Sequence, residues 1–235
     1  MTTNDFDSKI DTILYATWNT QAARVVPKTE DVVQINGAKQ LDATYLYADM
    51  ADSTVLVKNF EPEMAARVIR GYLRIAVDCI RAKGGHVRSF DGDRVMGIFI
   101  GDTRRNDAVG AALNITWAVE KTLNPKLAVK LWNSNAKFQV SHRSGIDDGA
   151  TFIVRGGARD NSDLVSIGNA PNIAAKLSGL RGEGGNITIT DRVYGALFPH
   201  NKTAAGGESM WVPRAEGWVG PHQVPTFSSG WMRKS

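Results

Sequence analysis

The apolar positions of the chain predict two long amphipathic helices. Between residues 62 and 83 they fall on one helical face, with a proline in the first turn and Gly84 just past the end. A second set between residues 108 and 119 has the same spacing. Asn106 or Asp107 is expected to cap this second helix, because short polar side chains accept hydrogen bonds from the free N–H groups of a first turn.

Strand patterns lie around and between these helices. Residues 43–49 are rich in β-formers, and residues 86–90 and 94–99 flank an Asp91-Gly92 dipeptide, which is a strong hairpin signal. Further along, the pattern predicts a strand, a helix, a strand and a short helix, over residues 138–146, 172–180, 187–190 and 191–198 in turn. This order predicts an α+β fold of the ferredoxin-like kind, with a mainly antiparallel sheet and helices packed on one face.

The two ends of the chain give weaker patterns. Four apolar residues near the start recur at helical spacing, namely Ile10, Ile13, Leu14 and Trp18. A polar stretch follows, so we expect residues 1–40 to form a helical appendage that supports a dimer, and residues 41–235 to form one domain. The final segment sets tryptophans among glycines and prolines and predicts no definite element.

Composition excludes several classes of protein. The 235 residues are 43% apolar, which is enough to bury a full core. Cys79 is the single cysteine, so an internal disulfide and a cysteine metal cluster are both excluded. No stretch approaches the roughly 18 apolar residues that span a bilayer, and the start lacks a leader pattern, so we expect a cytoplasmic protein without membrane insertion. The net charge of +4 suits a polyphosphate ligand, whereas the lack of a dense basic run with aromatic residues disfavours a nucleic-acid partner.

Two aspartates follow or join the predicted strands. Asp49 ends the first strand and Asp93 lies at the hairpin tip, so their carboxylates converge if those strands are neighbours. Paired carboxylates without an adjacent Cys or His suit a hard cation such as Mg²⁺ or Mn²⁺. A polar turn, Asp52-Ser53-Thr54, then opens a helix, whose N–H groups can bind phosphate oxygens. On position alone, the same aspartates also fit an ordinary pair of solvated turn residues.

Asn172 and Lys176 are four residues apart on one helical face, where an amide and a cation can bind one charged group. These two residues belong to the last of four blocks that together resemble the class III adenylate and guanylate cyclase family. The blocks follow one another in the family's order and comprise residues 47–50, 84–99, 145–149 and 167–177. The resemblance covers roughly residues 43–198 and implies that residues 41–235 are a nucleotidyl cyclase domain.

The resemblance implies an enzyme that closes a nucleoside triphosphate into a 3′,5′-cyclic monophosphate and releases pyrophosphate. Asp49 and Asp93 would bind two divalent cations, Mn²⁺ or Mg²⁺, with the Met50 carbonyl as a further ligand. Asn172 would orient the ribose. Lys176 stands where the family usually has an arginine that stabilises charge on the α-phosphate, and it lacks the planar pair of donors that arginine offers. The family also implies a homodimer with shared active sites, in which the aspartates of one chain act with Asn172 and Lys176 of the other.

Two positions depart from the purine readers of that family. Ser89 and Val165 stand where adenylate cyclases carry a Lys and an Asp that read the adenine edge, and the guanine-reading Glu and Cys are missing as well. The single-domain plan and the helix around Asn172 resemble the bacterial pyrimidine cyclases of the Pycsar systems. That resemblance implies conversion of UTP to cUMP, sensed by a separate effector protein in anti-phage defence. A cytidylate cyclase and an adenylate cyclase with atypical base recognition are the alternatives.

Two alternatives of another class stay open. A degenerate cyclase fold could act as a nucleotide sensor, although both metal aspartates and Asn172 are retained. A ferredoxin-like sheet could also bind RNA through exposed aromatic residues on its central strands, for which Phe90 and Phe99 are the candidates.

Overall fold

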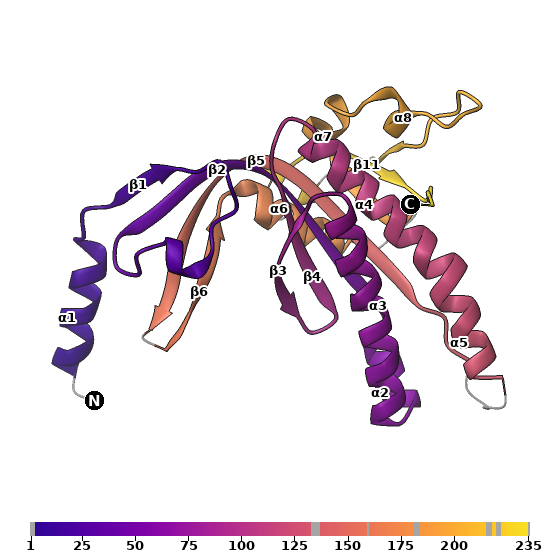
Figure 1. The fold of residues 1–235 in the computed structure, drawn as a ribbon, viewed down its shortest axis with the longest axis horizontal. Coiled ribbons are helices and arrows are strands. Elements are labelled where there is room, and N and C mark those ends of the chain that lie inside the picture. The colour runs from indigo at the N-terminus through magenta and orange to yellow at the C-terminus, as the bar shows by residue number, and fades with distance from the viewer. Residues whose placement is uncertain are drawn as a thin grey trace.

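A curved nine-stranded sheet forms the frame of the protein (Figure 1). The computed structural model describes residues 3–132, 137–158, 160–180, 184–214, 218–219 and 222–234. In chain order, the strands of this sheet are β1 (Asn19–Ala22), β2 (Gly37–Ala51), β3 (His86–Asp91), β4 (Arg94–Phe99), β5 (Ser141–Ala158), β6 (Asn161–Ile167), β7 (Ile187–Thr190), β8 (Val212–Arg214) and β11 (Thr226–Ser229). A separate pair joins β9 (Trp218–Val219) to β10 (His222–Gln223).

The long ladder between β2 and β5 is the centre of the sheet. It is antiparallel and runs from Ala38↔Val154 to Ala51↔Ser141 without a break in register. The main path through the sheet is β3-β4-β2-β5-β7-β11-β8, with β1 added beside β2 and β6 beside β5. Only the β1–β2 and β5–β7 pairs of this sheet are parallel among the described residues, so the predicted mainly antiparallel sheet is confirmed.

Helices cover both faces of the sheet (Figure 1). They are α1 (Thr3–Leu14), the short 3₁₀ turn η1 (Thr29–Asp31), α2 (Ser53–Asn59), α3 (Pro62–Ala82), α4 (Arg104–Ala118), the π-helical segment η2 (Val119–Leu123), α5 (Asn124–Lys130), α6 (Asn169–Ser178), α7 (Asp191–Gly195) and α8 (Pro199–Lys202). The larger core lies between the sheet and the pair α3 and α4, and it contains Leu46 and Ala48 of β2. The alternate residues of the same strand, Ala43 and Tyr45, belong to a second core on the opposite face.

The helix α6 covers that second face. Ala170 and Ala174 of α6 lie in the second core with Tyr45. A Cβ atom at Gly145 of β5 would lie 2.2 Å from the carbonyl oxygen of Ala174, so α6 packs directly on the strand backbone. The expectation that all helices lie on one face is therefore wrong for α6, because β2 is apolar on both sides and Gly145 leaves room for a helix.

The elements with the strongest local sequence signals form where the sequence predicts them. The helix α3 and the β3–β4 hairpin confirm the helix and the hairpin expected from the sequence. Gly84 ends α3 with a φ of 73°, and Gly92 turns the hairpin with a φ of 61°. Both values lie in the left-handed region that favours glycine, which is why these two positions set the boundaries so clearly.

The predicted cap of α4 is wrong. The helix begins at Arg104 with Thr103 as its N-cap, so Asn106 lies inside the first turn. There the buried Asn106 side chain accepts a hydrogen bond from the Phe198 backbone N–H at 2.7 Å and donates one to the Ala196 carbonyl at 3.2 Å. These contacts with a distant segment satisfy the amide, which a local pattern cannot reveal.

The strand expected over residues 138–146 has different bounds. The strand β5 begins at Ser141 and continues to Ala158, so the Gly-Ile-Asp-Asp-Gly block lies inside the strand rather than at its end. The tail then extends the sheet, because β11 pairs with β7 and β8 pairs with β11. Trp211 is buried beside this extension, and its Nε1–H donates to the Asn201 carbonyl at 2.7 Å.

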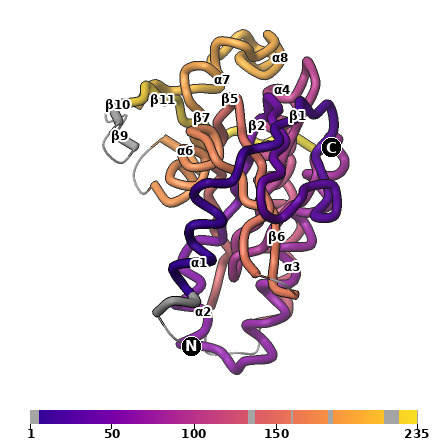
Figure 2. Tube along the Cα trace, turned by 90° about the vertical axis from the view of Figure 1, so that its left-hand side faces the viewer, coloured from indigo at the N-terminus to yellow at the C-terminus, as the bar shows by residue number. Residues whose placement is uncertain are grey.

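The first forty residues divide into two parts. Residues 19–22 join the sheet as β1, which pairs in parallel with the start of β2. Both views show α1 extending away from β1 toward the N-terminus (Figures 1 and 2). Trp18 lies between the two, with its ring centroid 5.7 Å from that of Phe152. The domain division at residue 40 stays a prediction. Within the described ranges, no helix has both the length and the apolar character needed to cross a membrane.

Candidate active site

The structure brings Asp49 and Asp93 together at one end of the sheet. Asp49 lies near the end of β2, and Asp93 lies in the turn between β3 and β4. The Met50 backbone N–H donates to the Asp93 carbonyl at 3.4 Å, and Asp49 pairs across the ladder with Arg94. The two carboxylates and the Met50 backbone thus share one short stretch of the β2–β4 edge.

This pair of acids carries negative charge that protein groups only partly balance. Burial first, and then the charge of Asp93, raise the pKa of Asp49, while Arg94 and Arg143 act in the opposite direction. Within the described residues, the buried Oδ2 atom of Asp93 has no hydrogen-bond partner. A buried carboxylate oxygen without a donor is costly, so the site is suited to a cation.

The donor set fits a hard divalent cation. Carboxylate and carbonyl oxygens are the ligands that Mg²⁺ and Mn²⁺ prefer, and Asp49, Asp93 and the Met50 carbonyl supply such oxygens. Over the described ranges, no group of three or more His, Cys, Asp or Glu side chains is arranged so that it could hold a metal ion by itself. Water and substrate oxygens would therefore have to complete the coordination, as is usual for Mg²⁺ beside phosphates.

A buried tyrosine lies near the aspartates with a histidine beside it, and sequence reasoning missed both. Tyr72 of α3 is fully buried, and its pKa is raised well above its usual value by burial and then by the charges of Asp49 and Asp93. Its ring lies 6.0 Å from that of His142, whose pKa burial lowers to about 4. His142 is therefore neutral at pH 7, and Asn186 lies 2.9 Å from its Nε2. The buried rings of Tyr72 and His142 lower the local dielectric constant near the acids.

The polar turn after β2 lies beside the acids. Asp52 adopts a left-handed φ of 58° and α2 begins at Ser53. The Val55 backbone N–H bonds the Asp52 carbonyl at 2.9 Å, whereas Asp52 makes no side-chain cap bond in the described structure. The role of residues 52–54 in binding phosphate stays a prediction.

Asn172 and Lys176 lie on α6, one turn apart, and both are exposed. In the part of the chain that the structure describes, no hydrogen bond or ion pair joins either side chain to Asp49 or Asp93. A single chain therefore presents two separate groups of candidate residues.

The two positions predicted to face the base lie on strands that a charged pair connects. Ser89 follows a register shift in β3, between Val87 and Ser89, and Val165 is 47% exposed on β6. Arg88, at that shift, bonds Asp163 of β6. The Nε–H of Arg88 is buried and has no partner among the described residues. Sequence reasoning passed over Arg88 because it looked only at the positions that the purine cyclases use.

The two acids of the Gly-Ile-Asp-Asp-Gly block are buried and paired with arginines. Asp148 is 3% exposed and lies 2.6 Å from both Arg104 and Arg105 at the start of α4. Burial alone would raise the pKa of Asp148, but the bonds from these arginines and from Thr44 hold it below its usual value. Asp147 accepts a hydrogen bond from the Thr190 hydroxyl.

Phe99, one of the two residues considered for RNA stacking, is buried in the core.

Comparison with known proteins identifies sequence relatives of this chain. No protein-family model matches it. A uridylate cyclase from Rhodovulum sp. (strain MB263) is 40% identical over 234 residues, covering 98% of this chain and 97% of that protein. A uridylate cyclase from Burkholderia cepacia is 38% identical, covering 91% of this chain and 90% of that protein.

Solved structures agree on the fold. The adenylyl cyclase CyaB from P. aeruginosa superposes with a TM-score of 0.61 at 21% identity, over 83% of this chain and 97% of that chain. The guanylyl cyclase Cya2 superposes with a TM-score of 0.65 at 17% identity, over 83% and 94% of the two chains. At such identities these structures show the shared fold alone. With the sequence relatives, they show that the chain belongs to the uridylate cyclase family within the class III nucleotidyl cyclases.

Proposed function

We propose that this protein is a uridylate cyclase, which converts UTP to cUMP and pyrophosphate. The observation that carries the proposal is the 38–40% identity, over most of the chain, to three proteins named uridylate cyclase. The paired carboxylates at Asp49 and Asp93 supply the matching chemistry, since a triphosphate substrate needs cations.

The reaction forms a bond between the ribose 3′-oxygen and the α-phosphorus, breaks the bond to the oxygen that bridges the β-phosphate, and releases one proton with the pyrophosphate. Divalent cations held by Asp49, Asp93 and the Met50 carbonyl would supply positive charge for the 3′-oxygen and the triphosphate. Asn172 would orient the ribose, and the Lys176 ammonium would act as a point charge beside the α-phosphate. The turn at residues 52–54 would offer backbone N–H groups to the phosphates.

The side chain of Arg88 gives a physical reason why the site would prefer uracil to cytosine. Arginine carries donors only, and uracil presents a carbonyl at the ring position where cytosine presents an amino donor. Arg88 precedes Ser89, its side chain is 20% exposed, and its partner Asp163 is two positions from Val165. An exposed N–H of the Arg88 guanidinium would donate to a base carbonyl, whereas it has no acceptor to offer a cytosine amino group.

The active site would be shared in a homodimer. Asn172 and Lys176 project from α6 without contacting the aspartates of their own chain in the described structure, and a second chain would supply the missing half. The cyclic product would act as a second messenger in bacterial anti-phage defence and would be sensed by a separate effector protein.

Incubation with each of the four ribonucleoside triphosphates and Mn²⁺ tests the substrate. We expect UTP to be consumed fastest and the product to have the mass of cUMP. Dominant cAMP would contradict the uridylate proposal and leave the cyclase intact. Absence of any cyclic product, with the fold confirmed by thermal unfolding, would favour a nucleotide sensor.

Arg88→Ala tests base recognition. Loss of a hydrogen bond from a charged donor costs about 1.5–3 kcal/mol, so the ratio of kcat/KM for UTP to that for CTP should fall by roughly 10- to 100-fold. The matched control is Asp163→Asn, which removes the partner's charge and keeps Arg88, and it should retain the preference for UTP. An unchanged ratio in folded Arg88→Ala would rule out this role.

A further inference from the structure

The helix α1 exposes an apolar stripe with acids along one flank. Its stripe consists of Phe6, Ile10, Ile13 and Leu14, which are between 49% and 69% exposed. At 100° per residue, Asp7 and Asp11 lie side by side along one edge of this stripe, and both are exposed. An amphipathic helix whose apolar face is open to solvent in one chain calls for a partner surface.

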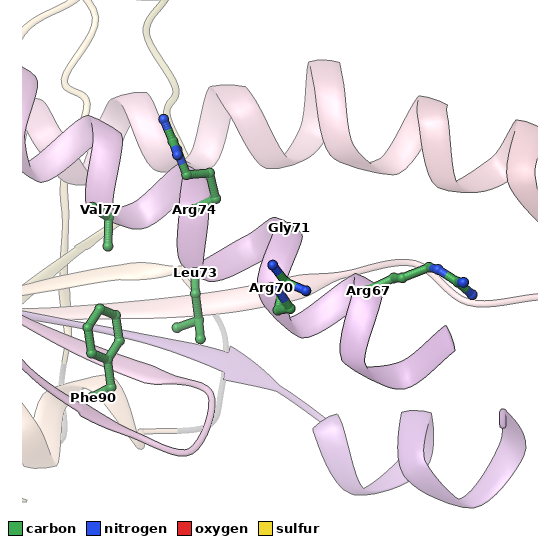
Figure 3. Close-up of a pocket in the computed structure, with 7 residues that line it drawn as sticks. All are labelled: Arg67, Arg70, Gly71, Leu73, Arg74, Val77 and Phe90. Carbon is green, nitrogen blue, oxygen red and sulfur yellow. The ribbon is translucent and has the colours of Figure 1, made fainter. Parts of the chain in front are cut away.

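A groove between α3 and β3 has the complementary character (Figure 3). Its apolar part consists of Leu73 and Val77 of α3 and Phe90 of β3, and Phe90 is 56% exposed. Figure 3 shows Phe90 opposite Leu73, with arginine side chains spreading from the same helix. The groove has a volume of about 650 Å³.

The basic flank of this groove follows the helical repeat. Arg67, Arg70 and Arg74 lie on one side of α3, next to the stripe formed by Leu73 and Val77. Arg74 is bonded to Asp78 at 2.6 Å, whereas the described residues give Arg67 and Arg70 no ion-pair partner. The groove therefore offers an apolar strip with positive charge along one edge, which complements the apolar stripe of α1 and its acidic edge.

We infer that α1 of one protomer docks in the α3–β3 groove of a second copy of this chain. The apolar stripe of α1 would cover Leu73, Val77 and Phe90, and Asp7 and Asp11 would face Arg67 and Arg70. Each protomer carries both surfaces, so a two-fold dimer makes the contact twice. The inference rests on the homodimer of the proposed function and assigns a segment of the chain to holding it together.

The position of α1 in its own chain and the charges beside its apolar stripe favour a second copy of the chain over docking within one chain or on a membrane. Within one chain, β6 and β3 lie between α1 and α3 in Figure 1, and the apolar stripe of α1 stays exposed. A membrane surface suits α1 poorly, because interfacial helices are rich in Lys and Arg beside the apolar face, whereas Asp7 and Asp11 flank one edge of this stripe and Lys9 alone flanks the other.

Sedimentation equilibrium of Ile10→Asp tests the docking without any need for turnover. A charge in the middle of the buried stripe should raise the dimer Kd by about tenfold or more. Ser8→Asp is the matched control, since Ser8 lies on the opposite side of α1, and it should leave the Kd unchanged. Equal Kd values for the two variants, or a wild-type chain that is monomeric throughout, would overturn the inference.

Disulfide trapping shows where α1 docks. Ile10→Cys and Phe90→Cys chains, prepared separately and mixed under mild oxidation, should give a covalent species of twice the mass. Each variant alone gives the background, and Cys79 contributes little because burial raises its pKa to about 11. No excess over background would overturn the docking even if cUMP is made. A trapped dimer, together with a wild-type chain that makes no cyclic nucleotide, would instead overturn the proposed function alone.

Discussion

Asp49→Asn and Asp93→Asn should each lower cUMP formation by more than about a hundredfold, since bound cations contribute several kcal/mol to such reactions. Asparagine keeps the shape of the side chain and removes the charge that holds the cations. The fold should survive, because the acids repel each other and the Asp93 Oδ2 atom has no partner among the described residues. Thermal unfolding should show equal or greater stability in both variants.

The same hairpin supplies the control for this experiment. Asp91 is exposed, pairs with Arg94 at 2.6 Å, and precedes Asp93 by two residues. Asp91→Asn makes the same chemical change beside the site and should keep most of the activity, measured with Mn²⁺ and mass detection of the product. More than a few per cent of wild-type activity in Asp49→Asn or Asp93→Asn would count heavily against the two-metal assignment.

Mixing two inactive variants should restore activity. If Asp49 of one chain acts with Asn172 of the other, a heterodimer of Asp49→Ala and Asn172→Ala chains has one site with both defects and one site with none. At equal amounts and random pairing, half the dimers hold one intact site of two, so roughly a quarter of wild-type activity should return. The exposure of Asn172, away from its own chain's aspartates, is the structural reason for this expectation.

A second mixture distinguishes sharing from a simple refolding effect. Asp49→Ala and Asp93→Ala lie in the same half of the site, so every site of their heterodimer carries one defect and no activity should return. Differently tagged chains would report subunit exchange in both mixtures. If exchange is complete and the first mixture stays inactive, all the site residues belong to one chain and the shared-site proposal fails.

Local signals in the sequence predicted much of the frame. The helix α3 and the β3–β4 hairpin follow from an apolar repeat and an Asp-Gly turn, because neither needs a distant partner to be recognised. The strands β8 and β11 were not predictable in this way, since their hydrogen bonds go to β7 and to each other. Asn106 shows the same limit, because its side chain is satisfied by a segment about 90 residues away.

The residues of the candidate site also divide into those that local sequence signals reveal and those that only the fold reveals. Asp49 and Asp93 stand out in the sequence because strand ends and hairpin tips are where acids can meet. Arg88 and Asp163 are far apart in the chain, and their pairing depends on how the strands curve, which apolar periodicity does not encode. Tyr72 and His142 look like ordinary core residues in the sequence, and only the fold places Tyr72 near the acids with His142 beside it.

The unbroken ladder between β2 and β5 limits how this lineage can change in length. It places Arg143 opposite Asp49 and Gly145 beneath α6, and side chains alternate between faces along a strand. One residue inserted between Ser141 and Gly145 would turn the following side chains to the other face and replace the glycine under α6 with a residue whose Cβ atom has no room there. Insertions and deletions that evolution retains should therefore fall outside this ladder, so that length variation among relatives marks the parts of the chain that do not set the site.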